Sequence, residues 1–159
     1  MSNEIRGIMI PAAKDKKVLL PNAIIAEVIS CSSLTNIDNS PNWLLGNFNW
    51  RGYEIPVICY NTLATGTRSN NKEIDRVAVI KALGDIELMP YFAMVVDGVP
   101  RLQLITQGDL QVHEAEESDS NAIASKVTIH DEMSEIPNIR YIEHVLSIAM
   151  PQKEVSLLG

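Results

Sequence analysis

The sequence contains few of the residues on which most enzymatic and nucleic-acid-binding sites depend. Among 159 residues there are two cysteines, three histidines and only 5% aromatic residues, and the formal net charge is −7. Nucleic acids and anionic membrane surfaces attract basic segments, so this charge balance argues against both kinds of partner. No nucleophile–base pair, metal-ligand spacing or phosphate-binding loop stands out.

The cysteines, Cys31 and Cys59, both lie within apolar runs. This placement favours two small buried residues in a reducing compartment over a disulfide or a reactive thiol. The start of the chain is polar and acidic, and no apolar stretch approaches the length that spans a membrane. We therefore expect a cytoplasmic protein without direct membrane insertion.

Apolar runs of strand length recur along the chain, separated by turn-forming residues. They are rich in β-branched side chains, which favours strands over helices. The hydrophobic content of 46% suits one folded domain with an aliphatic core. Residues 91–96 are so continuously apolar that both faces of this strand are expected to be buried. The predicted strands are residues 6–11, 18–21, 23–29, 54–60, 76–83, 90–96 and 101–106.

Two segments carry helical signals. Ser40, Pro41 and Gly46 are typical of the N-cap, the first position and the end of a one-turn helix at residues 40–46. A longer helix is predicted at residues 139–150, because three apolar side chains are spaced to share one face: Ile139, Ile142 and Leu146.

Turns and loops are predicted between these elements. Residues 14–17 form a charged turn, residues 62–73 a polar loop, and residues 118–121 a further loop. Asp97 and Gly98 are typical of a hairpin turn.

The most informative segment is WRGYEIPVICY, residues 50–60. It places a cation and a glycine, Arg51 and Gly52, at a turn before a strongly apolar strand. A fixed positive charge at the edge of a rigid β scaffold suits protein docking, because it can pair with a partner carboxylate. The alternative is a solvated turn arginine, and Gly52 is first of all a backbone requirement of the turn.

Three segments taken together resemble the CheW-like family of chemosensory coupling proteins: SPNWLLGNFNWRGYEIPVICY at residues 40–60, MVVDGV at residues 94–99 and PNAIIAEVI at residues 21–29. The resemblance covers nearly the whole chain. It implies an all-β fold of two intimately packed SH3-like five-stranded barrels with short helices. These barrels would form a single domain over residues 1–153, followed by a tail at residues 154–159.

The resemblance also implies a non-catalytic adaptor that has no cofactor and no metal. Its partners would be the regulatory domain of a CheA-type histidine kinase and the cytoplasmic tip of a chemoreceptor, at membrane-associated receptor arrays. No nucleic acid is expected. The implied partner-binding surface comprises Ile25, Glu27, Gly46, Trp50, Arg51 and Gly52.

Three residues depart from the family pattern. Cys59 replaces an aspartate, Tyr60 stands where an aliphatic residue is usual, and Trp50 puts a bulky aromatic side chain before Arg51. These departures imply a docking surface tuned to a different kinase or receptor from those of flagellar chemotaxis. They favour the divergent CheW-like proteins of pilus-associated (twitching) chemosensory systems.

Two other classes of function stay open. A metal-dependent hydrolase would use His113 and His130 with their acidic neighbours, although their spacings match no zinc template and adjacent strand residues point to opposite faces. A general assembly module would bind an unrelated partner. An assay for bound metal and a pull-down with a CheA-type kinase would separate these alternatives.

Overall fold

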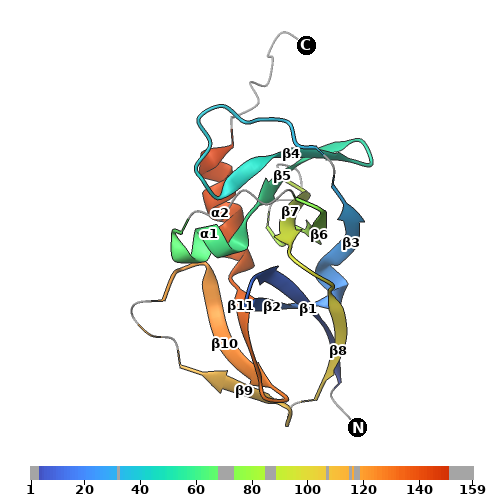
Figure 1. Ribbon diagram of the computed structural model, residues 1–159, viewed down its shortest axis with the longest axis vertical. Coiled ribbons are helices and arrows are strands. Elements are labelled where there is room, and N and C mark those ends of the chain that lie inside the picture. Colours follow the sequence, from blue (N-terminus) through green and yellow to red (C-terminus); the bar gives the residue numbers. More distant parts are fainter. Residues whose placement is uncertain are drawn as a thin grey trace.

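The computed structural model describes residues 4–31, 33–67, 74–84, 89–106, 108–114, 116 and 119–150. Most of this part of the chain lies in two β-sheets, one above the other in Figure 1. The all-β prediction is therefore confirmed.

The lower sheet in Figure 1 has six strands, which is one more than the predicted barrel. Its strands are β1 (Ile5–Ala13), β2 (Lys16–Pro21), β8 (Arg101–Ile105), β9 (Leu110–His113), β10 (Ile123–Ile129) and β11 (Glu132–Pro137). They lie in the order β8-β1-β2-β11-β10-β9. Only the contact between β2 and β11 is parallel.

The upper sheet has five strands in the order β3-β6-β7-β5-β4. They are β3 (Ile25–Ser30), β4 (Leu44–Trp50), β5 (Tyr53–Ile58), β6 (Arg76–Lys81) and β7 (Tyr91–Val96). Three helical segments accompany the sheets: the 3-10 turn η1 (Asn22–Ile24), α1 (Tyr60–Thr65) and α2 (Ile139–Ala149).

Each sheet encloses an apolar cluster of its own, and a third cluster lies between the sheets. The alternation of side chains along β1 shows the arrangement, because Met9 packs in the cluster of the six-stranded sheet and Ile10 in the cluster between the sheets. Buried residues of the five-stranded sheet's own cluster are Cys31, Trp50, Ile55, Val57, Val77, Val79 and Ala93. Two filled barrels joined by a shared core are the architecture that the resemblance implied.

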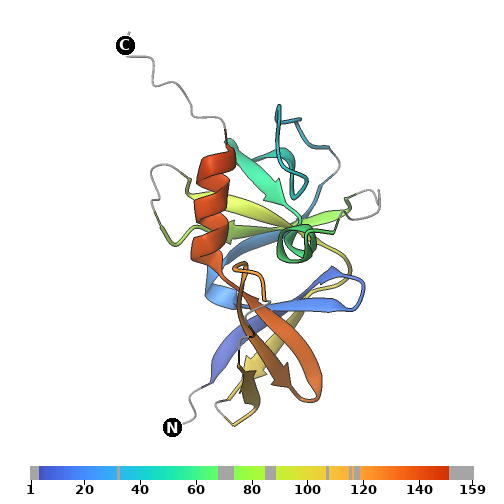
Figure 2. The same cartoon turned by 90° about the vertical axis from the view of Figure 1, so that its left-hand side faces the viewer.

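Helix α2 completes the shared core. Its apolar face buries Ile139, Ile142 and Leu146 against the cluster between the sheets, as the sequence predicts. The Asn138 side chain accepts a hydrogen bond from the backbone N–H of Tyr141 at 3.1 Å, which caps the first turn. Figure 2 shows the helix standing alongside the five-stranded sheet.

The helical turn predicted at residues 40–46 is wrong. The backbone makes a single turn, in which the Leu44 N–H donates to the Pro41 carbonyl at 3.0 Å, and Leu44 then begins strand β4. Leu44 and Trp50 are buried at the two ends of this strand, so pairing with β5 and burial outweigh the local cap-and-proline signal.

Two further predictions need correction. Residues 62–65 belong to helix α1 instead of a loop, and Gly66 ends this helix in the left-handed conformation. Residues 68–73 of the same predicted loop lie outside the described residues. The predicted charged turn at residues 14–17 is shorter than expected, since Lys16 already begins β2.

Asp97 and Gly98 do not form the predicted hairpin turn. Strand β7, which precedes them, belongs to the five-stranded sheet, whereas β8, which follows, belongs to the six-stranded sheet. The pair therefore carries the chain from one sheet to the other. The Asp97 N–H donates to the Pro11 carbonyl at 2.8 Å, which fixes this crossing against β1.

Both cysteines are free and buried, in line with the sequence. Among the described residues, no helix is long and apolar enough to cross a membrane.

Candidate functional site

Arg51 and Gly52 form the two-residue turn of the β4–β5 hairpin. Trp50 and Tyr53 pair across this hairpin, and both turn residues have positive φ, 49° for Arg51 and 83° for Gly52. Two successive left-handed residues define the type I′ turn, whose twist matches that of the flanking strands. The turn projects the Arg51 side chain outward, where 69% of it is exposed.

The Arg51 guanidinium is held from two sides. One nitrogen lies 3.5 Å from Glu27 Oε2, and the guanidinium carbon lies 5.0 Å from the centre of the Trp50 ring. The Trp50 indole donates to the same Glu27 oxygen at 2.7 Å. Glu27 therefore supports the cation and is itself anchored by the indole.

These contacts also close the barrel. Glu27 lies on β3 and Trp50 on β4, which are the opposite edges of the five-stranded sheet. The indole–carboxylate hydrogen bond joins the two edges, so the sheet has curled around its own core. The sequence-predicted residues Glu27, Trp50, Arg51 and Gly52 are thus brought together in one place, although 23 residues separate Glu27 from Trp50.

Trp50 lies mostly inside the protein, with only 5% of its surface exposed. Its ring packs edge-to-face against Tyr91, at a centroid distance of 4.9 Å. We therefore assign Trp50 a supporting role beneath Arg51 and Glu27, and we do not carry it forward as a direct partner contact.

Gly46 and Ile25 lie elsewhere in the barrel. Gly46 is buried on β4, and a Cβ atom at this position would stand 2.7 Å from the Thr35 carbonyl oxygen, so close packing explains the glycine. Ile25 begins β3 half-buried and packs against the core between the sheets. Gly52, by contrast, has open space around it. Partner contact at Gly46 and Ile25 stays a prediction.

Tyr53 and Tyr91 are members of this site that the sequence analysis did not single out. Tyr53 follows the turn directly and is 47% exposed, and its ring lies 5.3 Å from that of Tyr91. The sequence did contain a signal for Tyr53. Residues two apart on a strand share a face, so Tyr53 lies on the same face of β5 as Ile55, which is buried on the barrel side.

The histidines of the hydrolase hypothesis do not form a site. His113 Nε2 lies 2.6 Å from the Thr128 hydroxyl oxygen, on neighbouring strands. His130 and Asp131 form the two-residue turn between β10 and β11, with φ values of 47° and 65°. Within the described ranges, no group of three or more His, Cys, Asp or Glu side chains is arranged to hold a metal ion.

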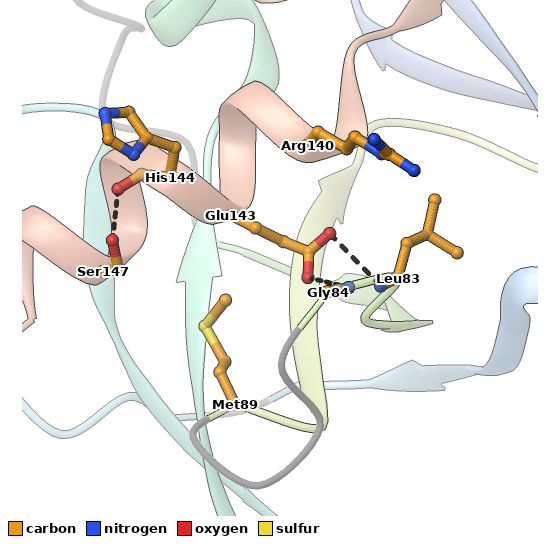
Figure 3. A pocket seen from close by; sticks show the side chains of 7 residues that line it. All are labelled: Leu83, Gly84, Met89, Arg140, Glu143, His144 and Ser147. Atoms are coloured by element: carbon orange, nitrogen blue, oxygen red, sulfur yellow. Dashed lines mark hydrogen bonds between the residues drawn. The ribbon is translucent and has the colours of Figure 1, made fainter.

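A groove of about 440 Å³ lies between α2 and the segments that flank the β6–β7 connection (Figure 3). The Glu143 carboxylate crosses it and accepts hydrogen bonds from the backbone N–H groups of Leu83 and Gly84, at 3.2 and 3.0 Å. The Ser147 hydroxyl donates to the backbone carbonyl of His144 at 2.6 Å, so the imidazole does not activate this serine. Glu143 alone among these groups therefore joins the helix to the neighbouring segment.

Comparison with known proteins decides the family. A model of the CheW-like domain matches residues 6–145. The chain belongs to the CheW-like family. A crystal structure of the scaffolding protein TtCheW from Thermoanaerobacter tengcongensis shares the fold, with a TM-score of 0.69 and 18% sequence identity, covering 85% of this chain and 84% of that chain. A search of curated proteins found no match.

All three residues that depart from the CheW-like pattern are buried, and Trp50 has been described above. Cys59 and Tyr60 are buried where β5 meets α1, and the Cys59 sulfur accepts a hydrogen bond from the Thr62 hydroxyl at 3.2 Å. They cannot tune a docking surface by direct contact. The expectation of a pilus-associated system drew partly on these residues, and it stays an expectation from the resemblance.

Proposed function

We propose that this CheW-like protein is a non-catalytic adaptor in chemosensory signalling. It would couple the regulatory domain of a CheA-type histidine kinase to the cytoplasmic tip of a chemoreceptor, within receptor arrays at the membrane. Family membership supports the adaptor class, and the type I′ turn that carries Arg51 supports a docking surface on the five-stranded barrel.

The observation that carries the docking proposal is the pre-organised Arg51. Glu27 and the Trp50 ring restrain the guanidinium before any partner arrives, so less side-chain entropy is lost on binding. The side chain nevertheless stays mostly exposed, and the guanidinium carries five N–H donors in all. A charge that is both rigid and accessible suits pairing with a partner carboxylate.

The first test is a binding measurement with charge-reversal variants. Arg51→Glu is expected to weaken binding to the purified regulatory domain of the cognate kinase, or to the receptor-tip fragment, by at least about tenfold, because the new carboxylate repels the partner. Arg140→Glu is the matched control, since Arg140 is an exposed arginine on α2 and the charge change is identical. Isothermal titration calorimetry gives the affinities.

Circular dichroism confirms that each variant is folded before binding is measured. Equal affinities for wild type and folded Arg51→Glu, with both partners, would place the docking surface elsewhere. An equal loss in both variants would show that overall charge, and not the turn, controls binding.

A further inference from the structure

Three aromatic rings stand together beside Arg51. Trp50, Tyr53 and Tyr91 form this group, which we call the aromatic shelf. The Tyr53 ring lies 6.4 Å from Trp50 and is inclined to it by 29°, and it meets Tyr91 edge-on at 5.3 Å. Trp50 is buried and Tyr91 half-buried, so Tyr53 is the ring that the shelf presents to solvent.

Position on the strand explains why Tyr53 reaches the surface. It shares the inward face of β5 with Ile55, but it stands at the rim of the barrel, one residue beyond the turn. An exposed large side chain is unremarkable by itself. Tyr53 differs because the Trp50 ring that it packs against also lies under the Arg51 guanidinium, so the exposed ring and the exposed cation are fixed relative to each other.

The charges around this surface favour an acidic occupant. Glu27 Oε2 is shared between Arg51 and the Trp50 indole, so the carboxylate of this chain only partly neutralises the cation. Glu54 follows Tyr53 on β5 and therefore points to the other face of the strand, where it accepts a hydrogen bond from the Asn47 side chain at 3.4 Å. It does not compete for Arg51 on the Tyr53 side.

We propose that Tyr53 determines partner specificity, and that it binds together with Arg51 a protein segment in which a carboxylate stands beside an apolar side chain. The carboxylate pairs with the free guanidinium donors, and the apolar side chain covers the Tyr53 ring. A tyrosine suits this role because it offers a large contact area and loses little conformational entropy when its ring is already packed. The proposal rests on the docking role of Arg51.

The test compares two substitutions of the same residue. Tyr53→Thr removes the ring but keeps a β-branched residue that suits the strand, and Tyr53→Phe keeps the ring without its hydroxyl. The probes are the purified kinase regulatory domain and the receptor-tip fragment used for Arg51. We expect Tyr53→Thr to weaken binding of one of them by about tenfold, with Tyr53→Phe within about twofold of wild type.

Val112→Thr provides the matched control, because Val112 is an exposed apolar residue on β9 of the other sheet. It is expected to bind both probes like wild type. A second experiment locates the partner carboxylate. Each exposed Asp or Glu of the probe whose binding is weakened is changed to Ala in turn. The substitution that makes the affinities for wild type and Arg51→Ala equal identifies the carboxylate that pairs with Arg51.

The outcomes separate this inference from the proposed function. If Arg51→Glu abolishes binding but folded Tyr53→Thr binds like wild type, the role of Tyr53 is overturned and the adaptor proposal stands. If no partner carboxylate couples to Arg51, the acidic occupant is overturned. If neither Arg51→Glu nor Tyr53→Thr changes binding of either probe, the docking surface itself is wrong, and this inference fails with it.

Discussion

Arg51 adopts a backbone conformation that arginine rarely adopts. Its φ of 49° lies in the left-handed region, which costs an ordinary L-residue roughly 1–2 kcal/mol, and type I′ turns prefer Asn or Asp before the glycine. The pairing with Glu27 is half-exposed and contributes less than about 1 kcal/mol. Strained backbone of this kind clusters at functional sites, which supports the proposed docking role of the Arg51 side chain.

Arg51→Asn is therefore expected to separate stability from binding. Asparagine relieves the strain of the turn, so the free energy of unfolding should equal or slightly exceed that of wild type, while affinity for the partner falls by about tenfold or more. Urea unfolding and calorimetry measure the two quantities. A clear loss of stability in Arg51→Asn would show that the guanidinium contacts hold the hairpin together.

The sequence assigned Arg51 and Glu27 to one partner-binding surface only through the family resemblance. No residue spacing predicts that Glu27, on one edge strand, meets Trp50, on the other, because that contact depends on the curl of the whole sheet. Trp50 was expected at the surface, and its burial follows from the same curl. The exposed ring at this rim is Tyr53, whose position the strand alternation could have indicated.

Strands were predictable where their apolar runs were long, as in β5, β6 and β7. Strands β9, β10 and β11 went unpredicted because polar residues alternate with their apolar ones, although the alternation of buried Val127 and Ile129 with Lys126 and Thr128 is itself a strand signal. Strand β4 was not predicted because Ser40, Pro41 and Gly46 are typical of a short helix. Local signals failed for β4 because its pairing with β5 and the burial of Leu44 and Trp50 determine the outcome.

Burial along strand β7 determines how substitutions there affect stability. The structure confirms burial at Phe92, Ala93, Met94 and Val96, whereas Val95 is only half-buried. Met94→Asp places an unpaired carboxylate in the core between the sheets and should destabilise the protein by several kcal/mol, enough to unfold a typical domain. Val95→Asp should be milder. Thermal melting that ranks Val95→Asp below Met94→Asp in stability would contradict this placement of the strand.

A polar bridge links the two barrels. The Tyr60 hydroxyl, at the start of α1, donates to Glu135 Oε1 on β11 at 2.8 Å, and Lys16 Nζ on β2 lies 3.6 Å from the same oxygen. Tyr60 is 1% exposed. Burial, followed by the hydrogen bond and the negative charge of Glu135, raises the pKa of the Tyr60 phenol far above its usual value. The resemblance could not predict this bridge, since it implies an aliphatic residue at position 60.

The raised pKa predicts loss of stability at alkaline pH. The folded state holds the phenol proton more tightly than the unfolded state, so this contribution is fully present below the ordinary pKa of about 10 and declines above it, by up to about 1.4 kcal/mol for each pH unit. Tyr60→Phe removes that dependence, and it should cost about 1–3 kcal/mol at neutral pH because Glu135 loses a hydrogen bond.

Urea unfolding at a series of alkaline pH values measures the effect, and phenolate absorbance follows the ionisation directly. In wild type, one of the four tyrosines should ionise only as the protein unfolds, and this late component should vanish in Tyr60→Phe. Identical alkaline profiles for the two proteins would contradict the bridge.

In the proposed function, this CheW-like chain couples a kinase to a receptor through the Arg51 turn. The most direct measurement is the rate of kinase autophosphorylation in a reconstituted mixture of receptor-bearing vesicles, CheA-type kinase and this protein, with and without receptor ligand. Kinase activity is expected to become ligand-dependent only when the adaptor is present. Arg140→Glu should support this control like the wild-type chain, whereas Arg51→Glu should not. Ligand control that is equally strong without the chain, or with Arg51→Glu, would contradict the claim.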